Sequence, residues 1–304
     1  MKIVAIINGK NRNAEKIKTE IEQKFAEFSP TCLITQKGQA FQIAKNATIN
    51  GTETIIAAGG DGTIHEIANG ILQTNMEISK LPAIAPYTAG TGNDLARSIN
   101  LGNNLDKIKQ KIVSNQWQIM DTAEITYQNF SGNTAKRYFI NMADLGIGAQ
   151  AINRIANRKK IYNGTIAYSQ AAIASFFTQK AVNVIVTSKD FEFKGLSTEI
   201  CIGNGKYFGG GFGISPYSNP FDSRLELLIV KKMNTARFIP LIKKMRDAKP
   251  IMINEFLYKR IINCNIESLA KHQHIVEADG ELLGTTPIQI KIASAALKIF
   301  ANTK

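Results

Sequence analysis

The sequence has few cysteines and no long apolar run among its 304 residues. Cys32, Cys201 and Cys264 are far apart and odd in number, so they fit neither a disulfide framework nor a metal knuckle and favour a reducing cytoplasm. No segment approaches the roughly 18 consecutive apolar residues of a membrane-spanning helix. The apolar start of the chain stops at Asn8, which is too early for a secretory signal and predicts a first strand.

Acidic residues are too few to balance the basic ones, and the net charge is +13. Such an excess attracts nucleic acid, an anionic membrane surface or phosphorylated substrates. A nucleic-acid binder is expected to interleave aromatic side chains with Lys and Arg, and the sequence shows no such platform. For any single basic group, such as Arg237 to Lys249, a solvated helix face is the simpler interpretation. Together the groups predict a protein that associates peripherally with the inner face of a membrane.

The first 124 residues alternate apolar runs with segments of helical spacing. Strands are expected at 2–8, 31–35, 54–60 and 83–85, and helices at 13–28, 38–46, 63–73 and 93–99. This order predicts a parallel sheet covered on both faces, with ligands bound beyond the carboxyl ends of its strands.

After about residue 122 the pattern becomes rich in strands, with helical interruptions near 150–178 and 235–248. We therefore expect a second, mainly antiparallel domain over residues 125–292 and a first domain of residues 1–124. The cleft between two domains is the default place for an active site. An exposed edge strand of the second domain suggests a possible homodimer.

Two glycine-rich turns carry the chemistry of the first domain. Residues 58–63 read Ala-Gly-Gly-Asp-Gly-Thr, with Glu66 one helical turn further on, and residues 88–97 contain Gly-Thr-Gly-Asn-Asp. Each turn follows a strand and opens a helix, where glycine lets the backbone approach a ligand and the helix N-terminus favours an anion. A tight turn with an Asp or Asn cap is the alternative, but two such turns in succession favour phosphate binding.

At these residues the sequence resembles the diacylglycerol kinase catalytic-domain family, which includes bacterial lipid kinases and sphingosine kinases. The GGDGTxxE signature spans Gly59 to Glu66, and GTGNDxAR spans Gly90 to Arg97. Further matches, in chain order, are Asn204, Gly209-Gly210-Gly211, Pro216, Asp222 with Leu225, Asp279-Gly280-Glu281 and Pro287. The resemblance covers nearly the whole chain.

The resemblance implies a nucleotide-binding domain similar to those of NAD kinases and phosphofructokinases, followed by a β-sandwich-like lipid-substrate domain. A last strand, in about residues 293–304, would return to the first domain. The implied activity is transfer of the γ-phosphoryl group of ATP to the hydroxyl of a lipid, most simply a diacylglycerol-like one, with Mg²⁺. Positioning and charge neutralisation dominate such a reaction, together with a carboxylate near the accepting hydroxyl.

The resemblance also implies roles for individual residues. Glu281 would be the general base, with Asp61 its rival and Asp279 a further catalytic residue. Asp61, Asp94 and Asp121 would form a carboxylate network at magnesium. A structural magnesium would be held by Asp222 together with the backbone carbonyls of Asn219 and Arg224. The implied nucleotide contacts are Asn8, Thr35, Gly59, Gly60, Asp61, Gly62, Thr63, Ile64, His65, Gly90, Thr91, Asn93 and Asp94.

The sequence departs from the family pattern in the first loop and at the metal site. Residues 8–12 read Asn-Gly-Lys-Asn-Arg where Asn-Pro-x-x-Gly is usual. Ser223 stands where glycine is usual, and Glu226 replaces an aspartate.

Two other functions remain open at this point, an NAD kinase and a non-catalytic basic nucleotide-binding protein. The usual Asn-Glu pair of NAD kinases after the second turn is missing. The apolar stretch 161–177 is expected either to pack between domains or to line the entrance for an acyl chain.

Overall fold

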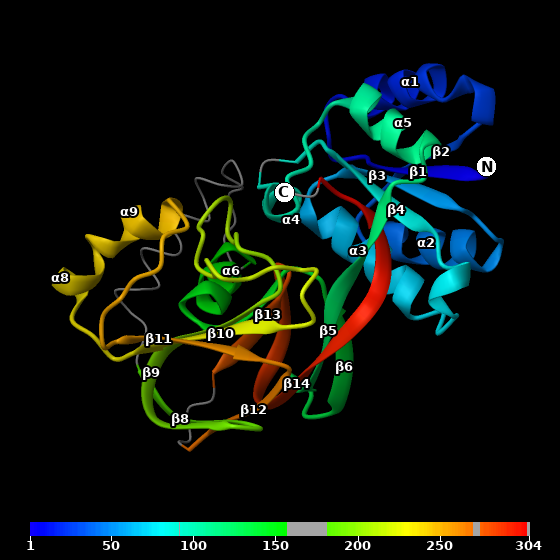
Figure 1. Ribbon diagram of the computed structural model, residues 1–304. Helices are drawn as coiled ribbons and strands as arrows, with labels where there is room; N and C mark the ends of the chain where they lie inside the picture. The colour runs from blue at the N-terminus through cyan, green and yellow to red at the C-terminus, as the bar shows by residue number, and fades with distance from the viewer. Residues whose placement is uncertain (91, 157–180, 270–273, 303–304) are drawn as a thin grey trace. The chain divides into compact units, whose positions relative to one another are not determined.

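The computed structural model describes residues 1–90, 92–156, 181–269 and 274–302 (Figure 1). Thr91 and the stretch 161–177 lie outside these residues. The chain divides into unit 1, residues 1–121 with 294–304, and unit 2, residues 122–293. It passes from one unit to the other within strands β5 (Trp117–Asn129) and β14 (Glu281–Phe300). No helix among the described residues has the length and apolar character needed to cross a membrane.

The sheet of unit 1 has the strand order β2–β1–β3–β4–β14, and its neighbouring strands are parallel. The strands are β1 (Ile3–Asn8), β2 (Thr31–Thr35), β3 (Thr54–Gly59), β4 (Ala83–Thr88) and the end of β14. The helices are α1 (Ala14–Lys24), α2 (Gln39–Ile49), α3 (Asp61–Leu72), α4 (Asp94–Ser98) and α5 (Leu105–Val113), with 3-10 turns at Ala26–Phe28 and Ile78–Lys80.

Helices cover both faces of this sheet, with α1 and α5 on one side and α2 and α3 on the other (Figure 1). The helix expected over 13–28 ends at Lys24 and continues as a 3-10 turn, which lets Phe25 enter the core beside Ile21. Helix α5 was not predicted. Its buried Ile108 and Ile112 and its cap, where the side chain of Asn104 accepts the N–H of Lys107 at 3.0 Å, are the signals that mark it.

Unit 2 is built from antiparallel strand pairs, with a large apolar core cluster and a second, smaller one. After β5, its strands are β6 (Thr134–Phe139), β7 (Met142–Gly146), β8 (Val182–Ser188), β9 (Phe191–Gly203), β10 (Leu225–Lys231), β11 (Phe256–Ile261), β12 (Asn263–Ser268) and β13 (Ile275–Ala278). The helices are α6 (Ile147–Ala156), α8 (Thr235–Phe238) and α9 (Leu241–Arg246). Among the described strands β11 pairs only with β10, and pairing of two copies through such an edge stays a prediction.

Candidate active site

The two glycine turns of unit 1 meet at the carboxyl edge of its sheet. Gly59 ends β3 and Gly60 precedes α3, whereas Gly90 lies just beyond β4. A Cβ built on Gly90 would lie 2.5 Å from the Cα of Gly60 and 3.1 Å from its amide nitrogen. Because only glycine fits at this approach, the two sequence motifs form one backbone surface.

The carboxylate of Asp61 joins the two turns. Its oxygens accept the backbone N–H groups of Asp94 at 3.1 Å and Leu95 at 3.0 Å, which are the first residues of α4. The preceding residue, Asn93, has a φ of +55° and its side chain makes no cap hydrogen bond to the helix. Asp61 therefore supplies the cap that the start of α4 needs, and it holds the second motif in place.

Asn8 and Thr35 end β1 and β2 at the same edge and are partners in the strand register. Thr35 is buried, and its hydroxyl donates to the carbonyl oxygen of Ile7 at 3.2 Å. The side-chain oxygen of Asn8 accepts the N–H of Lys10 at 3.0 Å. Both side chains thus support the backbone of this edge, and their contact with a nucleotide stays a prediction.

The residues after the first glycine turn point into unit 1. Ile64 and His65 are each 1% exposed, and the N–H groups of Thr63 and Ile64 donate to the carbonyl of Gly60. These side chains lie beneath the turn. The geometry favours a supporting role for them, with Gly60 and its neighbours at the surface of the turn.

The Asp-Gly-Glu motif forms the turn of the β13–β14 hairpin in unit 2. Asp279 and Gly280 have φ values of +48° and +88°, which are typical of a type I′ turn. The Asp279 carboxylate accepts the N–H groups of Ile140, Asn141 and Met142 at 2.8, 3.0 and 2.9 Å. Asp279 therefore holds the segment between β6 and β7 against the hairpin, which is a positioning role.

Glu281, the first residue of β14, forms an ion pair with Arg137 of β6, and both side chains are about one-third exposed. The charges of this ion pair act on the pKa of Tyr127 in β5. Burial raises the pKa of its hydroxyl, and the charges of Arg137 and Glu281 act on that pKa in opposite directions. Sequence reasoning missed Arg137 and Tyr127 because a cross-strand ion pair 144 residues apart leaves no local spacing to detect.

The carboxylate of Asp222 faces a guanidinium group where the resemblance implies a metal ion. It forms an ion pair with Arg260 and accepts the N–H of Arg224 at 3.1 Å. Ser223 has a φ of +57°, a left-handed conformation that explains why glycine is usual at this position. One carboxylate that faces a guanidinium is not the oxygen cage that Mg²⁺ prefers. Magnesium at Asn219, Asp222 and Arg224 stays a prediction that requires Arg260 to move.

Glu226 has a structural environment rather than a metal-binding one. It is 2% exposed, and its carboxylate accepts the Ser215 hydroxyl at 2.9 Å, the Tyr217 N–H at 2.8 Å and the Ser218 hydroxyl at 3.3 Å. The aspartate-to-glutamate departure from the family pattern thus falls on a side chain that anchors the loop before β10.

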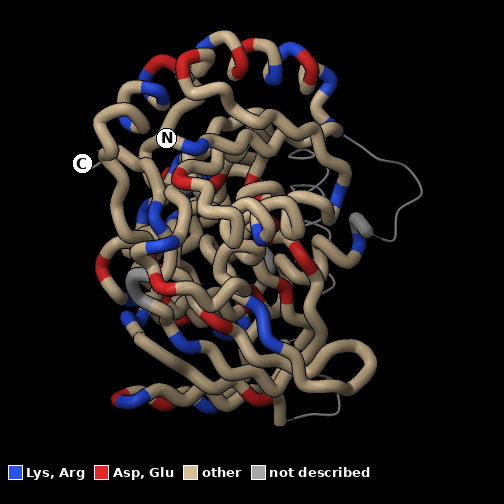
Figure 2. Tube along the Cα trace, turned by 90° about the vertical axis from the view of Figure 1, so that its right-hand side faces the viewer, with Lys and Arg blue, Asp and Glu red and all other residues tan. Residues whose placement is uncertain are grey.

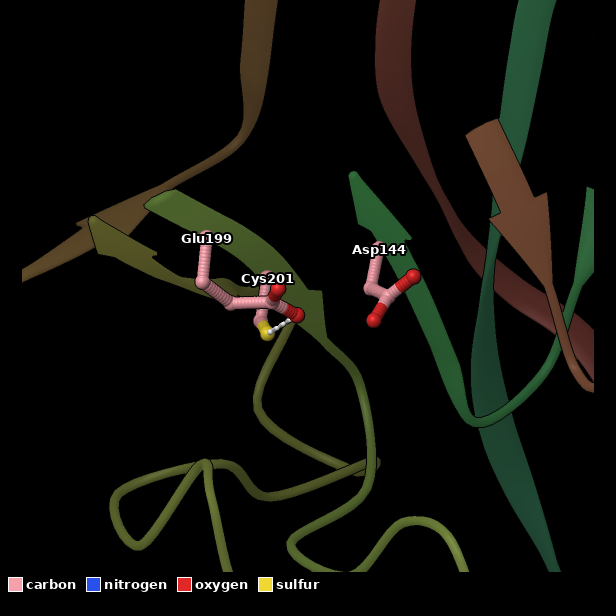
Figure 3. A group of neighbouring side chains, drawn as sticks. All are labelled: Asp144, Glu199 and Cys201. Atoms are coloured by element: carbon pink, nitrogen blue, oxygen red, sulfur yellow. Dashed lines mark hydrogen bonds between the residues drawn. The ribbon is translucent and has the colours of Figure 1, made fainter. Parts of the chain in front are cut away.

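Three side chains that the sequence patterns did not single out lie together inside unit 2 (Figure 3). Asp144 of β7 and Glu199 and Cys201 of β9 are buried, and their ligand atoms lie within 4.8 Å of one another. The Cys201 thiol donates to Glu199 at 3.3 Å, whereas both carboxylate oxygens of Asp144 are buried without a hydrogen-bond partner among the described residues. Burial at such close range makes it unfavourable for both carboxyl groups to be charged at once.

The N-terminus of α6 meets this carboxyl pair. The N–H of Ile147 donates to Glu199, and a Cβ on Gly148 would overlap the carboxylate of Asp144. Burial raises the pKa of Asp144 to about 6 and holds the pKa of Glu199 well above its usual range. Carboxylates and a thiolate are also metal ligands, but the positive end of a helix disfavours a cation. The group is best described as two neighbouring buried carboxyl groups, of which Glu199 accepts the N–H at the start of α6.

Comparison with known proteins identifies both parts of the chain. The family model of the diacylglycerol kinase catalytic domain matches residues 2–125. That of the YegS C-terminal NAD kinase beta sandwich-like domain matches residues 142–301, more than half of the chain. Lipid kinase YegS of Escherichia coli (strain K12) is 27% identical over 263 residues, which are 86% of this chain and 83% of that protein.

Solved structures agree in fold. A crystal structure of a diacylglycerol kinase from Bacillus anthracis str. Sterne has a TM-score of 0.72 at 21% identity, and covers 99% of this chain and 97% of that chain. A second structure from the same organism has a TM-score of 0.78 at 22% identity with the same coverage. The expected two-part architecture and the family resemblance of the motifs are confirmed. The chain belongs to the diacylglycerol kinase catalytic-domain family and is a kinase.

Proposed function

We propose that this protein transfers the γ-phosphoryl group of ATP to a hydroxyl group of a diacylglycerol-like lipid. The observation that carries the proposal is the contact between the two glycine turns, with the Asp61 carboxylate bridging them. This arrangement offers close backbone approach and the N-terminus of a 12-residue helix at one place, which suits a chain of phosphates.

The nucleotide would be held by backbone rather than by large side chains. In the proposed site, the turns at Gly59–Gly62 and Gly90–Asn93 contact the phosphates, and the ends of β1 and β2, at Asn8 and Thr35, contact the remainder of ATP. Pre-organised N–H groups stabilise phosphate charge without having to reorient during the reaction. The contacts between the turns therefore serve catalysis by fixing the position of the donor.

Asp61, Asp94 and Asp121 offer the oxygen ligands that Mg²⁺ prefers. Asp94 and Asp121 are 5% and 3% exposed, so both are carboxylates inside unit 1 that a divalent cation would stabilise. When bound, magnesium would neutralise charge on the transferred phosphoryl group. Because Asp61 also caps α4, movement of this carboxylate would disturb the second glycine turn.

Glu281 is the proposed general base. In the reaction the lipid hydroxyl oxygen bonds to the γ-phosphorus while the bond to the bridging oxygen of ADP breaks, and the hydroxyl proton passes to the carboxylate of Glu281. The ion pair with Arg137 fixes the orientation of that carboxylate. Asp279 acts as a positioning residue through its three backbone hydrogen bonds.

Incubation with ATP labelled at its γ-phosphate, followed by chloroform extraction and thin-layer separation, tests the proposal. We expect labelled phospholipid in the organic phase. Label found only as NADP in the aqueous phase, or in neither product, would refute the lipid-kinase proposal in favour of an NAD kinase or a non-catalytic protein.

Two substitutions then test the assigned residues. Glu281→Gln is expected to lower kcat by about 10²- to 10⁴-fold, the usual contribution of a general base. Asp61→Asn is expected to abolish activity with the fold retained, as judged by far-UV circular dichroism. Glu267→Gln, at an exposed position of β12, is the matched control and should keep full activity.

The lipid substrate and the net charge of +13 also support peripheral association with the membrane, at the cytoplasmic side.

A further inference from the structure

The excess positive charge is not distributed evenly along the chain. Helix α1, at the top of Figure 2, alternates three Lys with three Glu, so its blue and red segments are interspersed. The segment 231–249 of unit 2 instead contains seven basic residues and one acidic residue. It includes α8 and α9, which lie next to each other at the side of that unit (Figure 1).

Apolar side chains fix one side of this segment to unit 2. Phe238, Leu241 and Met245 are buried in the same core cluster as Ile251, so α8, α9 and the chain after them pack on the sheet. Other residues of this segment and of the chain just after it are exposed. We call the following six the α8–α9 face: Arg237, Ile239, Lys243, Lys244, Arg246 and Met252.

Two of the exposed side chains on this face are apolar. Ile239 is 51% exposed, and Met252, at 79%, is the most exposed large apolar side chain in the described part of the protein. The hydroxyl of Tyr217, itself 49% exposed, lies 3.9 Å from the sulfur of Met252. Exposed apolar groups beside several cations are typical of surfaces that insert shallowly into a bilayer.

The basic side chains of the face differ in their partners. Arg237 pairs with Glu255, Lys249 pairs with Asp247, and the guanidinium of Arg246 lies 4.9 Å from the centre of the Phe212 ring. Lys243 and Lys244 form no ion pair with any acidic side chain in the described ranges. A surface with this charge and with protruding aliphatic groups complements anionic lipid headgroups above acyl chains.

We propose that the α8–α9 face binds the surface of an anionic bilayer, with Lys243, Lys244 and Arg246 against headgroups and Ile239 and Met252 at the boundary with the acyl chains. The inference deepens the proposed function, because it names the surface through which a lipid kinase meets its membrane. If the α8–α9 face instead bound nucleic acid, the protein would bind RNA in preference to vesicles.

Vesicle sedimentation tests the inference on the full chain. We expect binding to phosphatidylcholine vesicles that contain phosphatidylglycerol, and little binding to vesicles of phosphatidylcholine alone. Each lysine near such a surface contributes about a fivefold gain in partitioning. The double variant Lys243→Gln/Lys244→Gln should therefore bind about 25-fold more weakly. Preferential binding to a single-stranded RNA probe, or equal binding to both kinds of vesicle, would overturn the proposal.

The matched control is Lys189→Gln/Lys194→Gln, which removes two exposed lysines from the β8–β9 hairpin of the same unit. An equal loss of binding in the two double variants would mean that net charge alone attracts the protein, and would refute a specific face. High salt screens the electrostatic part of vesicle binding and leaves the apolar part. Met252→Ser should weaken the binding that remains at high salt, since the contribution of Met252 is apolar. If Met252→Ser has no effect on vesicle binding, the proposed place of Met252 at the boundary with the acyl chains is refuted.

An activity measurement separates this inference from the proposed function. With lipid presented in neutral detergent micelles, the Lys243→Gln/Lys244→Gln variant should keep the wild-type kcat. Lipid phosphorylation in micelles without vesicle binding would refute the α8–α9 face and leave the kinase proposal standing. Vesicle binding without any phosphorylated lipid would refute the kinase proposal and leave the α8–α9 face standing.

Discussion

The substitution Asp144→Asn tests whether the buried carboxyl pair destabilises the protein at neutral pH. Asp144 is fully buried beside Glu199, and burial raises its pKa to about 6 from an ordinary value of 3.8. The folded protein therefore binds this proton more tightly than the unfolded chain does. Its contribution to stability is fully present below about pH 4 and is lost as the pH rises through about 6.

The size of the effect follows from the pKa shift. A difference of about two units, at 1.36 kcal/mol each, amounts to about 3 kcal/mol by pH 7.5. Asparagine has nearly the same shape, carries no charge, and can donate its side-chain N–H to Glu199. The variant should be more stable than the wild type by up to about 3 kcal/mol at pH 7.5, with the advantage gone at pH 4.

Urea unfolding followed by far-UV circular dichroism at pH 4, 5, 6 and 7.5 measures this difference. The control Asp190→Asn removes a carboxylate from the exposed β8–β9 turn and should show no such pH-dependent gain. A stability difference between Asp144→Asn and the wild type that stays constant from pH 4 to 7.5 would refute the raised pKa of Asp144. Stability that rises with pH only in the wild type would do so as well.

Three further substitutions address the contact between the glycine turns, the turn between β13 and β14, and the carboxylate of Asp222. Gly90→Ala places a Cβ 2.5 Å from the Cα of Gly60 and should therefore lower stability by about 1–3 kcal/mol. It should also weaken the binding of ATP, which calorimetry measures. An unchanged affinity for ATP would argue against contact between the turns. Asp279→Ala removes the acceptor of three backbone N–H groups and should lower stability by about 3 kcal/mol, as measured by thermal unfolding. A loss of activity without a loss of stability would instead indicate that Asp279 takes part directly in catalysis. Arg260→Gln frees the carboxylate of Asp222 and should increase the rise in Tm that Mg²⁺ produces; no change would mean that Asp222 is not a metal ligand.

Local patterns in the sequence were sufficient for the short-range structure. The strand expected at 31–35 is observed as Thr31–Thr35, because apolar alternation and flanking turn residues are properties of adjacent positions. The two glycine turns were located for the same reason, since each needs glycine at particular backbone positions. Helix α5 carried equally local signals in its cap at Asn104 and in the spacing of Ile108 and Ile112, and was missed although they were present.

The sequence by itself therefore determined the family and, apart from α5, the alternation of strands and helices in the first domain, and it predicted which motifs bind phosphate. The tertiary structure decided what those motifs touch. It placed the Asp61 carboxylate on the start of α4, Arg137 on Glu281, and Asp144 against Glu199. Each of these contacts joins residues that are distant in the chain. Which side chains meet depends on how elements that are distant in the chain are brought together, and the spacing of neighbouring residues in the sequence does not specify this.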